Sequence, residues 1–214
     1  MPDIPPKIHI ANFSLRFGQR RLFENFSLTV HTGEKVLLAG PSGCGKSSIL
    51  ASVAGFLQPD EGTIRVDGEV LTPATVWTIR RRLAYVPQTI DFGDRTVQAW
   101  VDEALAFRNN SGAPSIEGLV EELSALGLRN DILARRSSDM SGGERQRVAL
   151  ALGLFLKRPL LLVDEPSSAL DAAAARALFQ RLERVSGMTM LLVSHEHPER
   201  LTCVDRMVKV GEIE

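Results

Sequence analysis

A glycine-rich segment, Gly40-Pro41-Ser42-Gly43-Cys44-Gly45-Lys46-Ser47, constrains the fold of this chain more than any other feature. It matches the pattern G-x-x-x-x-G-K-[ST] and lies between a predicted buried strand (35–39) and a predicted short helix (48–56). In that context the backbone N–H groups wrap around phosphate oxygens, and the start of the helix adds a favourable dipole. Short Gly/Ser loops also connect strands to helices without binding anything, but the complete match favours a nucleoside triphosphate site.

The residues expected to contact the triphosphate are those of this loop and the next residue: Gly40, Pro41, Ser42, Gly43, Cys44, Gly45, Lys46, Ser47 and Ser48. The Lys46 ammonium can reach the β- and γ-phosphates, and the Ser47 hydroxyl can bind Mg²⁺. A nucleoside triphosphate with Mg²⁺ is therefore the expected ligand.

Composition indicates a globular protein with one sizeable core. The chain has 214 residues, of which 44% are hydrophobic and 24% charged. The formal net charge is -1, so nothing global favours a nucleic-acid partner. The longest apolar run, 148–156, is much shorter than the roughly 20 residues of a membrane span. No signal peptide is recognisable at the start, so we expect any membrane role to be peripheral.

The order of predicted elements indicates one α/β domain. Short β-rich segments (8–10 and 26–30) and a hairpin signal at Asp67-Gly68 predict an antiparallel layer before the parallel core. From 97 to 153 the pattern is helical. We therefore expect a core of about 1–88 and 154–214 with an inserted helical subdomain at about 89–153.

Ser141-Gly142-Gly143-Glu144 is a capping-box sequence at the start of a long predicted helix. A helix cap alone would explain Ser141 and Glu144. It does not explain the glycines, which cost the helix roughly 1 kcal/mol each relative to Ala. Glycine there allows the close approach of another backbone or of a phosphate.

Two carboxylates and a histidine follow predicted buried strands. Asp164 and Glu165 come after the apolar run 160–163, where open α/β sheets bind ligands. Asp171 has the position of a helix N-cap. His195 follows the strand 188–193, where a catalytic role and an ordinary packed or surface role are about equally favoured.

The order of these motifs resembles that of the ATP-binding cassette (ABC) family over essentially the whole chain. The resemblance implies a RecA-like P-loop NTPase core with an antiparallel β layer and a helical insert. It also assigns positions in chain order: the adenine-stacking aromatic at Phe17, the Walker A loop at 40–47, the Q-loop glutamine at Gln88, the signature at 140–144, the Walker B strand at 160–164, the catalytic carboxylate at Glu165, the D-loop at 168–171 and the switch histidine at His195. The signature has Met140 and Glu144 where the family commonly has Leu and Gln.

The resemblance implies that two copies of the chain close head to tail around ATP. One copy would contribute Phe17 and the Walker A loop, with Lys46, Gln88, Glu165 and His195 as catalytic residues. Ser47, Gln88 and Asp164 would hold Mg²⁺. The other copy would contact the same nucleotide through a set of signature and D-loop residues: Ser141, Gly142, Gly143, Glu144 and Asp171.

The leading interpretation is the ATP-hydrolysing subunit of an ABC transporter. It would lie in the cytoplasm, on the inner face of the cell membrane, bound to a separate polytopic permease. The helical insert and residues after Gln88, including Phe92 and Trp100, would form the groove for that permease. Two alternatives are an ATPase that remodels a membrane complex or the cell envelope and, less favoured, a soluble ATPase acting on DNA or ribosomes. No nucleic-acid partner is expected.

Overall fold

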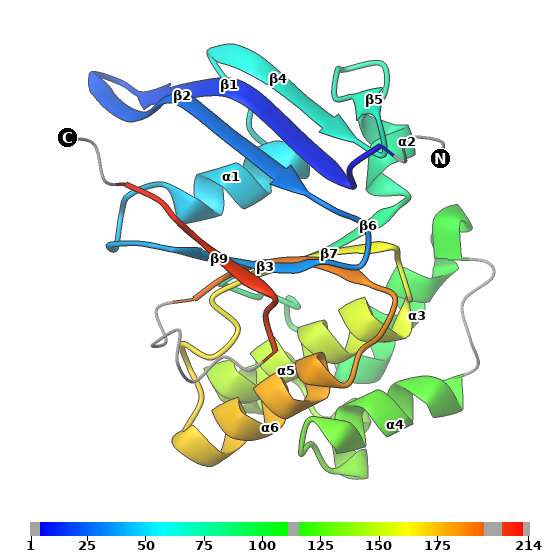
Figure 1. Ribbon diagram of the computed structural model, residues 1–214. Coiled ribbons are helices and arrows are strands. Elements are labelled where there is room, and N and C mark those ends of the chain that lie inside the picture. Colours follow the sequence, from blue (N-terminus) through cyan, green and yellow to red (C-terminus); the bar gives the residue numbers. More distant parts are fainter. Residues whose placement is uncertain (1–4, 111–115, 195–202, 212–214) are drawn as a thin grey trace.

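The computed structural model describes residues 5–110, 116–194 and 203–211. Its strands form two sheets in separate layers (Figure 1). The antiparallel sheet has the order β2-β1-β4-β5 and consists of β1 (Ile8–Phe17), β2 (Arg20–Val30), β4 (Glu61–Val66) and β5 (Glu69–Val70). The parallel sheet has the order β6-β7-β8-β3-β9 and consists of β3 (Lys35–Ala39), β6 (Leu83–Val86), β7 (Leu160–Asp164), β8 (Thr189–Val193) and β9 (Arg206–Lys209).

The helices lie in two layers. Helix α1 (Lys46–Val53) lies between the two sheets, whereas the helices drawn below the parallel sheet in Figure 1 cover its other face. The helices on that other face are α3 (Val97–Ala106), α4 (Ile116–Ala125), α5 (Gly142–Phe155) and α6 (Ala172–Glu183). The short helix α2 (Val76–Arg80) lies above the parallel sheet, beside β5. Three short 3₁₀ helices span Arg108–Asn110, Asn130–Ala134 and Ser137–Asp139.

The parallel sheet separates two hydrophobic cores. Successive side chains of a strand point to opposite faces, and β7 is buried along its whole length. Leu160 and Leu162 pack in the core shared with α1 and the antiparallel sheet. Leu161 and Val163 pack in the core shared with the helices on the other face. The apolar run in the sequence thus corresponds to a strand that is covered on both sides.

The predicted arrangement of elements is confirmed, with shifted boundaries. The hairpin at Asp67-Gly68 joins β4 to β5, and the first two strands are longer than their β-rich cores in the sequence. Helix α1 begins at Lys46 and ends at Val53, whereas the sequence predicted 48–56. None of the helices in the described part of the chain combines the length and hydropathy that a membrane span requires.

Helix α5 connects the helical insert to the sheet. It packs with α4 in the same core as the lower face of β7. A Cβ atom at Gly153 would lie only 3.2 Å from Val86 and 3.3 Å from Leu161, so the C-terminal part of the helix lies directly on the sheet. The division of the chain into a core and a subdomain at residue 153 stays a prediction.

We expect Leu191→Ala to destabilise the chain by about 2–5 kcal/mol, because it leaves a cavity in a fully buried strand between β7 and β3. Met207→Ala is the matched control, since Met207 lies on the edge strand β9 with 40% of its surface exposed. Urea unfolding of the three proteins measures the difference. Equal losses in both variants would contradict the assignment of the core.

Candidate functional site

The glycine-rich loop connects β3 to α1 as the sequence predicted. Gly45 immediately precedes α1 with φ +102°, a left-handed conformation, and a Cβ atom there would lie 2.5 Å from the Phe23 ring. Glycine is therefore required on both conformational and steric grounds. The buried Lys46 ammonium donates hydrogen bonds to the Gly40 and Pro41 carbonyls, each at 2.9 Å. These bonds hold the cation against the loop.

The loop meets the end of β7 through a direct side-chain contact. The Ser47 hydroxyl donates to Asp164 Oδ1 at 2.9 Å. Strand β8 separates β3 from β7, so the contact spans the carboxyl edge of the parallel sheet. Asp164 is 3% exposed. The structure thus brings together two oxygen donors that are 117 residues apart in the sequence.

Glu165 follows β7 in a conformation that is unusual for a residue with a side chain. Its φ is +49°, in the left-handed region. The Glu165 N–H donates to the Val193 carbonyl at 2.9 Å, which ties this backbone to the end of β8. Such conformations cost roughly 1–3 kcal/mol and are concentrated at functional sites. Here it leaves the carboxylate buried at the carboxyl edge of the sheet.

A cavity of about 360 Å³ lies over the loop. Phe17, from the end of β1, lines it with 55% of its surface exposed, as an aromatic that stacks on a base would need to be. The structure therefore unites several of the predicted site residues. The predicted residues in its lining are Phe17, Ser42, Gly43, Gly45, Lys46, Ser47, Ser48, Gln88 and Glu165.

Sequence reasoning missed Arg20, which also lines this cavity. Its guanidinium donates to the Gly43 carbonyl at 3.1 Å and so connects the first hairpin to the loop. A single arginine after a turn carries no pattern in the sequence. Its position three residues after Phe17 becomes informative only when Phe17 is placed in the site.

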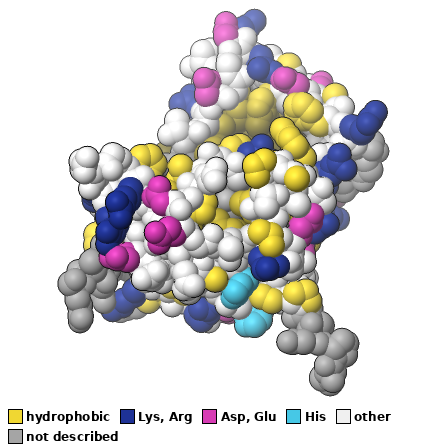
Figure 2. Space-filling view, turned by 90° about the horizontal axis from the view of Figure 1, so that it is seen from above, with side chains coloured by type: hydrophobic (Ala, Val, Ile, Leu, Met, Phe, Trp, Pro, Cys, Tyr) yellow, Lys and Arg dark blue, Asp and Glu magenta, His cyan; other side chains and the backbone are white. Residues whose placement is uncertain are grey.

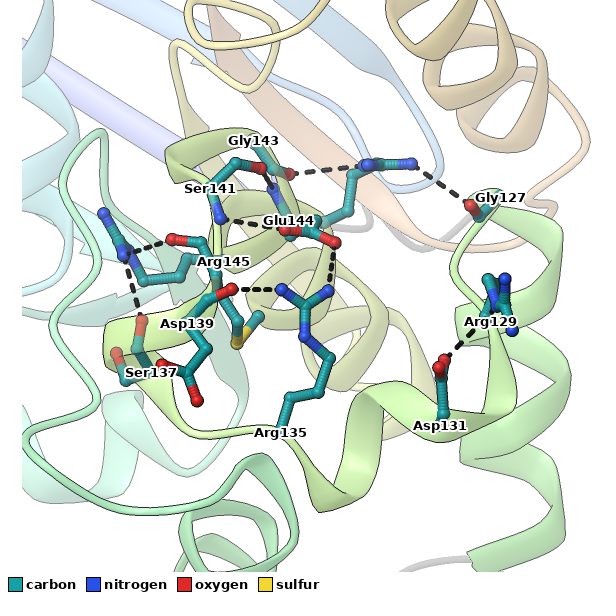
Figure 3. A network of polar contacts seen from close by, with 12 residues as sticks. Gly127, Arg129, Asp131, Arg135, Ser137, Asp139, Ser141, Gly143, Glu144 and Arg145 are labelled. Atoms are coloured by element: carbon teal, nitrogen blue, oxygen red, sulfur yellow. Dashed lines mark hydrogen bonds and ion pairs between the residues drawn. The ribbon is translucent and has the colours of Figure 1, made fainter.

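The signature segment, residues 140–144, forms no part of the cavity lining. It begins α5 through a complete capping box, shown in Figure 3. Glu144 N–H donates to Ser141 Oγ at 3.1 Å, and Ser141 N–H donates to Glu144 Oε2 at 2.8 Å. Arg135 donates to the other carboxylate oxygen, Glu144 Oε1, at 2.6 Å.

The Glu144 carboxylate is held in its ionised form. Partial burial raises its pKa, but hydrogen bonds from Ser141 and Arg135 outweigh burial, and the pKa lies below its usual value. The stability contributed by these bonds is therefore present above the unfolded-state pKa and is lost as the pH falls through the lower folded-state pKa.

The structure explains the glycine at 143 by packing within the chain. A Cβ atom at Gly143 would lie 2.6 Å from the Ala169 carbonyl oxygen and 2.7 Å from Leu170. The predicted close approach of another backbone therefore occurs, and that backbone is the 168–171 segment of the same chain. At Gly142 the nearest atom would be the Ala169 Cβ at 3.6 Å, which is an ordinary contact.

Asp171 caps α6, as its position in the sequence predicted. Its carboxylate accepts hydrogen bonds from the Ala173 and Ala174 N–H groups at 2.9 and 2.8 Å. These bonds lower the pKa of Asp171. The predicted contact of Asp171 with nucleotide stays a prediction.

The comparison with known protein families agrees with this geometry. The family model for ABC transporters matches residues 23–168. The chain belongs to the ABC transporter family.

Curated relatives are similar over nearly the whole of this cassette. A sulfate/thiosulfate import ATP-binding protein of Cucumis sativus is 37% identical over 216 residues, covering 97% of this chain and 61% of the relative. An Fe(3+) ions import ATP-binding protein of Mesorhizobium japonicum is 36% identical over 201 residues, covering 91% of this chain and 55% of the relative. The cassette thus spans roughly three fifths of the length of the curated relatives it matches.

Solved structures share the fold. A dimeric ATP-binding cassette in a post-hydrolysis state, bound to ADP and Pi, superimposes with a TM-score of 0.84 at 27% identity and covers 95% of this chain and 94% of that one. A bacterial Atm1-family ABC exporter with ATP bound has a TM-score of 0.83 at 24% identity, covering 99% of this chain and 39% of that one. The predicted P-loop NTPase fold is therefore confirmed.

His195 lies outside the described residues, so its role as a switch histidine stays a prediction. The prediction that Phe92 lines a groove was wrong, because Phe92 is 1% exposed and packs its ring 4.4 Å from that of Trp100. Trp100 itself lines a cavity of about 360 Å³ together with Tyr85, Ile90 and Leu156.

We expect Gly143→Ala to lower the free energy of unfolding by about 1–3 kcal/mol, since the new methyl group overlaps the Ala169 carbonyl. Gly142→Ala is the matched control, and it should leave stability unchanged or raise it by up to about 1 kcal/mol through better helix propensity. Thermal unfolding without nucleotide measures both. The packing explanation fails if the two variants lose stability equally.

Proposed function

We propose that this cassette is the ATP-hydrolysing subunit of an ABC transporter and that two copies close around ATP. The observation that carries the proposal is the contact of Ser47 with Asp164 beside a cavity lined by Phe17, Lys46 and Glu165. One cavity thus has four kinds of group at or beside it: an aromatic surface for a base, a phosphate-binding loop, a pair of oxygen donors and a buried carboxylate.

The phosphate loop would bind the triphosphate through its N–H groups and through Lys46. In the structure the Lys46 ammonium donates hydrogen bonds to two carbonyl groups of the loop. Phosphate oxygens would replace them as partners, because an ionised acceptor binds an ammonium more strongly than a carbonyl does. Phe17 would stack on the base.

The residues at the carboxyl edge of the sheet fit a magnesium site. The Ser47 hydroxyl and the Asp164 carboxylate already touch, and oxygen donors are the ligands that Mg²⁺ prefers. The side-chain oxygen of Gln88, which lines the same cavity, would be a further ligand. Bound there, Mg²⁺ would neutralise charge that develops on the β- and γ-phosphates.

Glu165 would orient the attacking water and accept its proton. A general base must lie at the reacting group, and the buried Glu165 carboxylate lines the cavity beside Lys46 and Ser47. His195 would donate a hydrogen bond to the γ-phosphate. Both roles follow from the family resemblance.

The other half of each site would come from the partner copy. The Ser141 hydroxyl is exposed and accepts from Glu144 N–H, so its own hydrogen can be donated to a phosphate oxygen. Gly142, also exposed, lies in the first turn of α5, where N–H groups and the helix dipole attract anions. Gly143, Glu144 and Asp171 complete the set of residues that we propose the partner copy places at this nucleotide. The dimeric state of the similar cassette bound to ADP and Pi supports this arrangement.

The cassette would act with a separate membrane permease on the cytoplasmic side of the cell membrane. Trp100 and the cavity beside it are the surface proposed for the permease. The relatives are named as import ATP-binding proteins, for sulfate/thiosulfate, for Fe(3+) ions and for spermidine/putrescine. These names support a role in import. Because they refer to different substrates, they do not favour any one transported substrate for this cassette.

The alternatives have less support. An ATPase acting on DNA or ribosomes would need a surface of predominantly positive charge. Figure 2 instead shows side chains of both signs scattered over the face above the antiparallel sheet. No relative among those described is named for remodelling of a membrane complex or of the cell envelope.

We expect Glu165→Gln to retain ATP binding and to lose steady-state hydrolysis by roughly 10²- to 10⁴-fold, since the amide cannot accept the proton from water. Titration with a fluorescent ATP analogue measures binding, and phosphate release measures turnover. Glu24→Gln, on the exposed part of β2, is the control for loss of one carboxylate and should hydrolyse ATP normally. Normal turnover by Glu165→Gln would refute the assignment of the base.

We expect Phe17→Ala to weaken ATP binding by about 1–3 kcal/mol, the usual contribution of one base–aromatic stack. Phe17→Tyr keeps the ring and should bind normally. Tripolyphosphate, which has no base, should bind all three proteins equally in a competition titration. Equal weakening for ATP and tripolyphosphate would show that Phe17 acts on the loop and not on the base.

A further inference from the structure

The signature of this cassette places a negative charge beside a surface proposed to bind a polyanion. Glu144 is the third residue of α5, in the same turn as Ser141 and Gly142. Its carboxylate is ionised, because its hydrogen bonds lower its pKa. An anion at this point opposes the attraction of the helix start for phosphate, and the partner's ATP would feel that opposition.

One cation lies directly on this carboxylate. The Arg135 guanidinium donates to Glu144 Oε1 at 2.6 Å, and the two side chains are 35% and 22% exposed. The contact is therefore partly shielded from water and weakened less by solvent than a surface pair. In the part of the chain that the structure describes, Arg135 is the one cation paired with Glu144.

The neighbouring arginines, Arg145 and Arg147, donate hydrogen bonds to backbone carbonyl groups. Arg145 donates to the Ser137 and Met140 carbonyls at 3.1 and 2.8 Å. Arg147 donates to the Gly143 carbonyl at 3.3 Å and to the Leu126 carbonyl at 3.1 Å. Figure 3 shows Arg135 approaching Glu144 from the segment before the signature, on the side away from Arg145.

Hydrogen bonds hold both the side chain and the backbone of Arg135 in place. Its guanidinium also donates to the Asp139 carbonyl, just before the signature. Its backbone carbonyl accepts from Val97 N–H at 3.0 Å, at the start of α3. The cation is thus fixed between the helical insert and α5.

We propose that Arg135 is a positioning residue of the signature: by pairing with Glu144 it cancels the negative charge that would otherwise face the ATP held by the partner copy. The inference rests on the proposed function, in which the signature contacts that ATP. It predicts that charge balance at 135 and 144, more than the identity of either residue, sets how readily ATP closes the dimer.

The test uses four proteins in the Glu165→Gln background, where hydrolysis does not reverse closure. They carry no further change, Arg135→Gln, Glu144→Gln, or both. Analytical ultracentrifugation over a range of Mg-ATP concentrations gives the half-point of dimerisation, which is the Mg-ATP concentration at which half of the protein is dimeric. Arg135→Gln should raise this concentration about three- to thirtyfold, the range of a unit charge at a helix terminus. Glu144→Gln should lower it, and the double variant should return close to the parent.

Two controls separate charge from structure. Arg129→Gln removes the same charge from an arginine that is 88% exposed and pairs with Asp131, so its half-point should equal the parent's. Arg135→Lys keeps the charge and should dimerise much like the parent, which tests the proposal even where Arg135→Gln unfolds. Thermal unfolding confirms that each protein is folded.

A double variant as weak as Arg135→Gln would overturn the inference, because Arg135 would then act through the Asp139 carbonyl and packing alone. An unchanged half-point in Arg135→Gln would overturn it as well. Failure of the parent to dimerise with ATP is a different result, since it would refute the proposed function itself.

Discussion

The Ser47–Asp164 hydrogen bond joins the two halves of the polypeptide at the carboxyl edge of the parallel sheet. Ser47 is placed by the turn into α1, and Asp164 is placed by a strand buried on both faces. Neither side chain could be held there without the sheet, because the strand between them, β8, fixes their separation. The geometry of the site is therefore a property of the core and not of the loop alone.

The two cores on either side of the sheet serve different parts of the site. The core that contains α1 and the antiparallel layer positions Phe17, Lys46 and Ser47. The core under the sheet holds α5 and α6, whose first turns carry the signature and Asp171. Strand β7, like β3, β6 and β8, contributes side chains to both cores, and the carboxylates of Asp164 and Glu165 stand at its carboxyl end.

Much of the fold and half of the site could be predicted from the sequence, because their signals are local. The loop pattern, the apolar run before Asp164 and the capping box each depend on residues close together in the chain. Arg20, Phe92 and Arg135 have no such signal, since their roles come from contacts with Gly43, Trp100 and Glu144. Gly143 is intermediate: its cost to the helix was visible, but its neighbour at Ala169 was not.

The packing of Gly143 against Ala169 and Leu170 links two surfaces that would belong to different active sites. Gly143 is buried directly behind the exposed Ser141 and Gly142, which are proposed to face the partner's nucleotide, whereas Ala169 lies four residues after Glu165, the base proposed for the chain's own nucleotide. A Cβ atom at Gly143 would overlap both the backbone carbonyl of Ala169 and the side chain of Leu170. A displacement of the signature toward this segment would therefore meet the Ala169 backbone. In the closed dimer proposed above, each chain would thus connect, through this contact, residues placed at its own nucleotide with residues placed at its partner's.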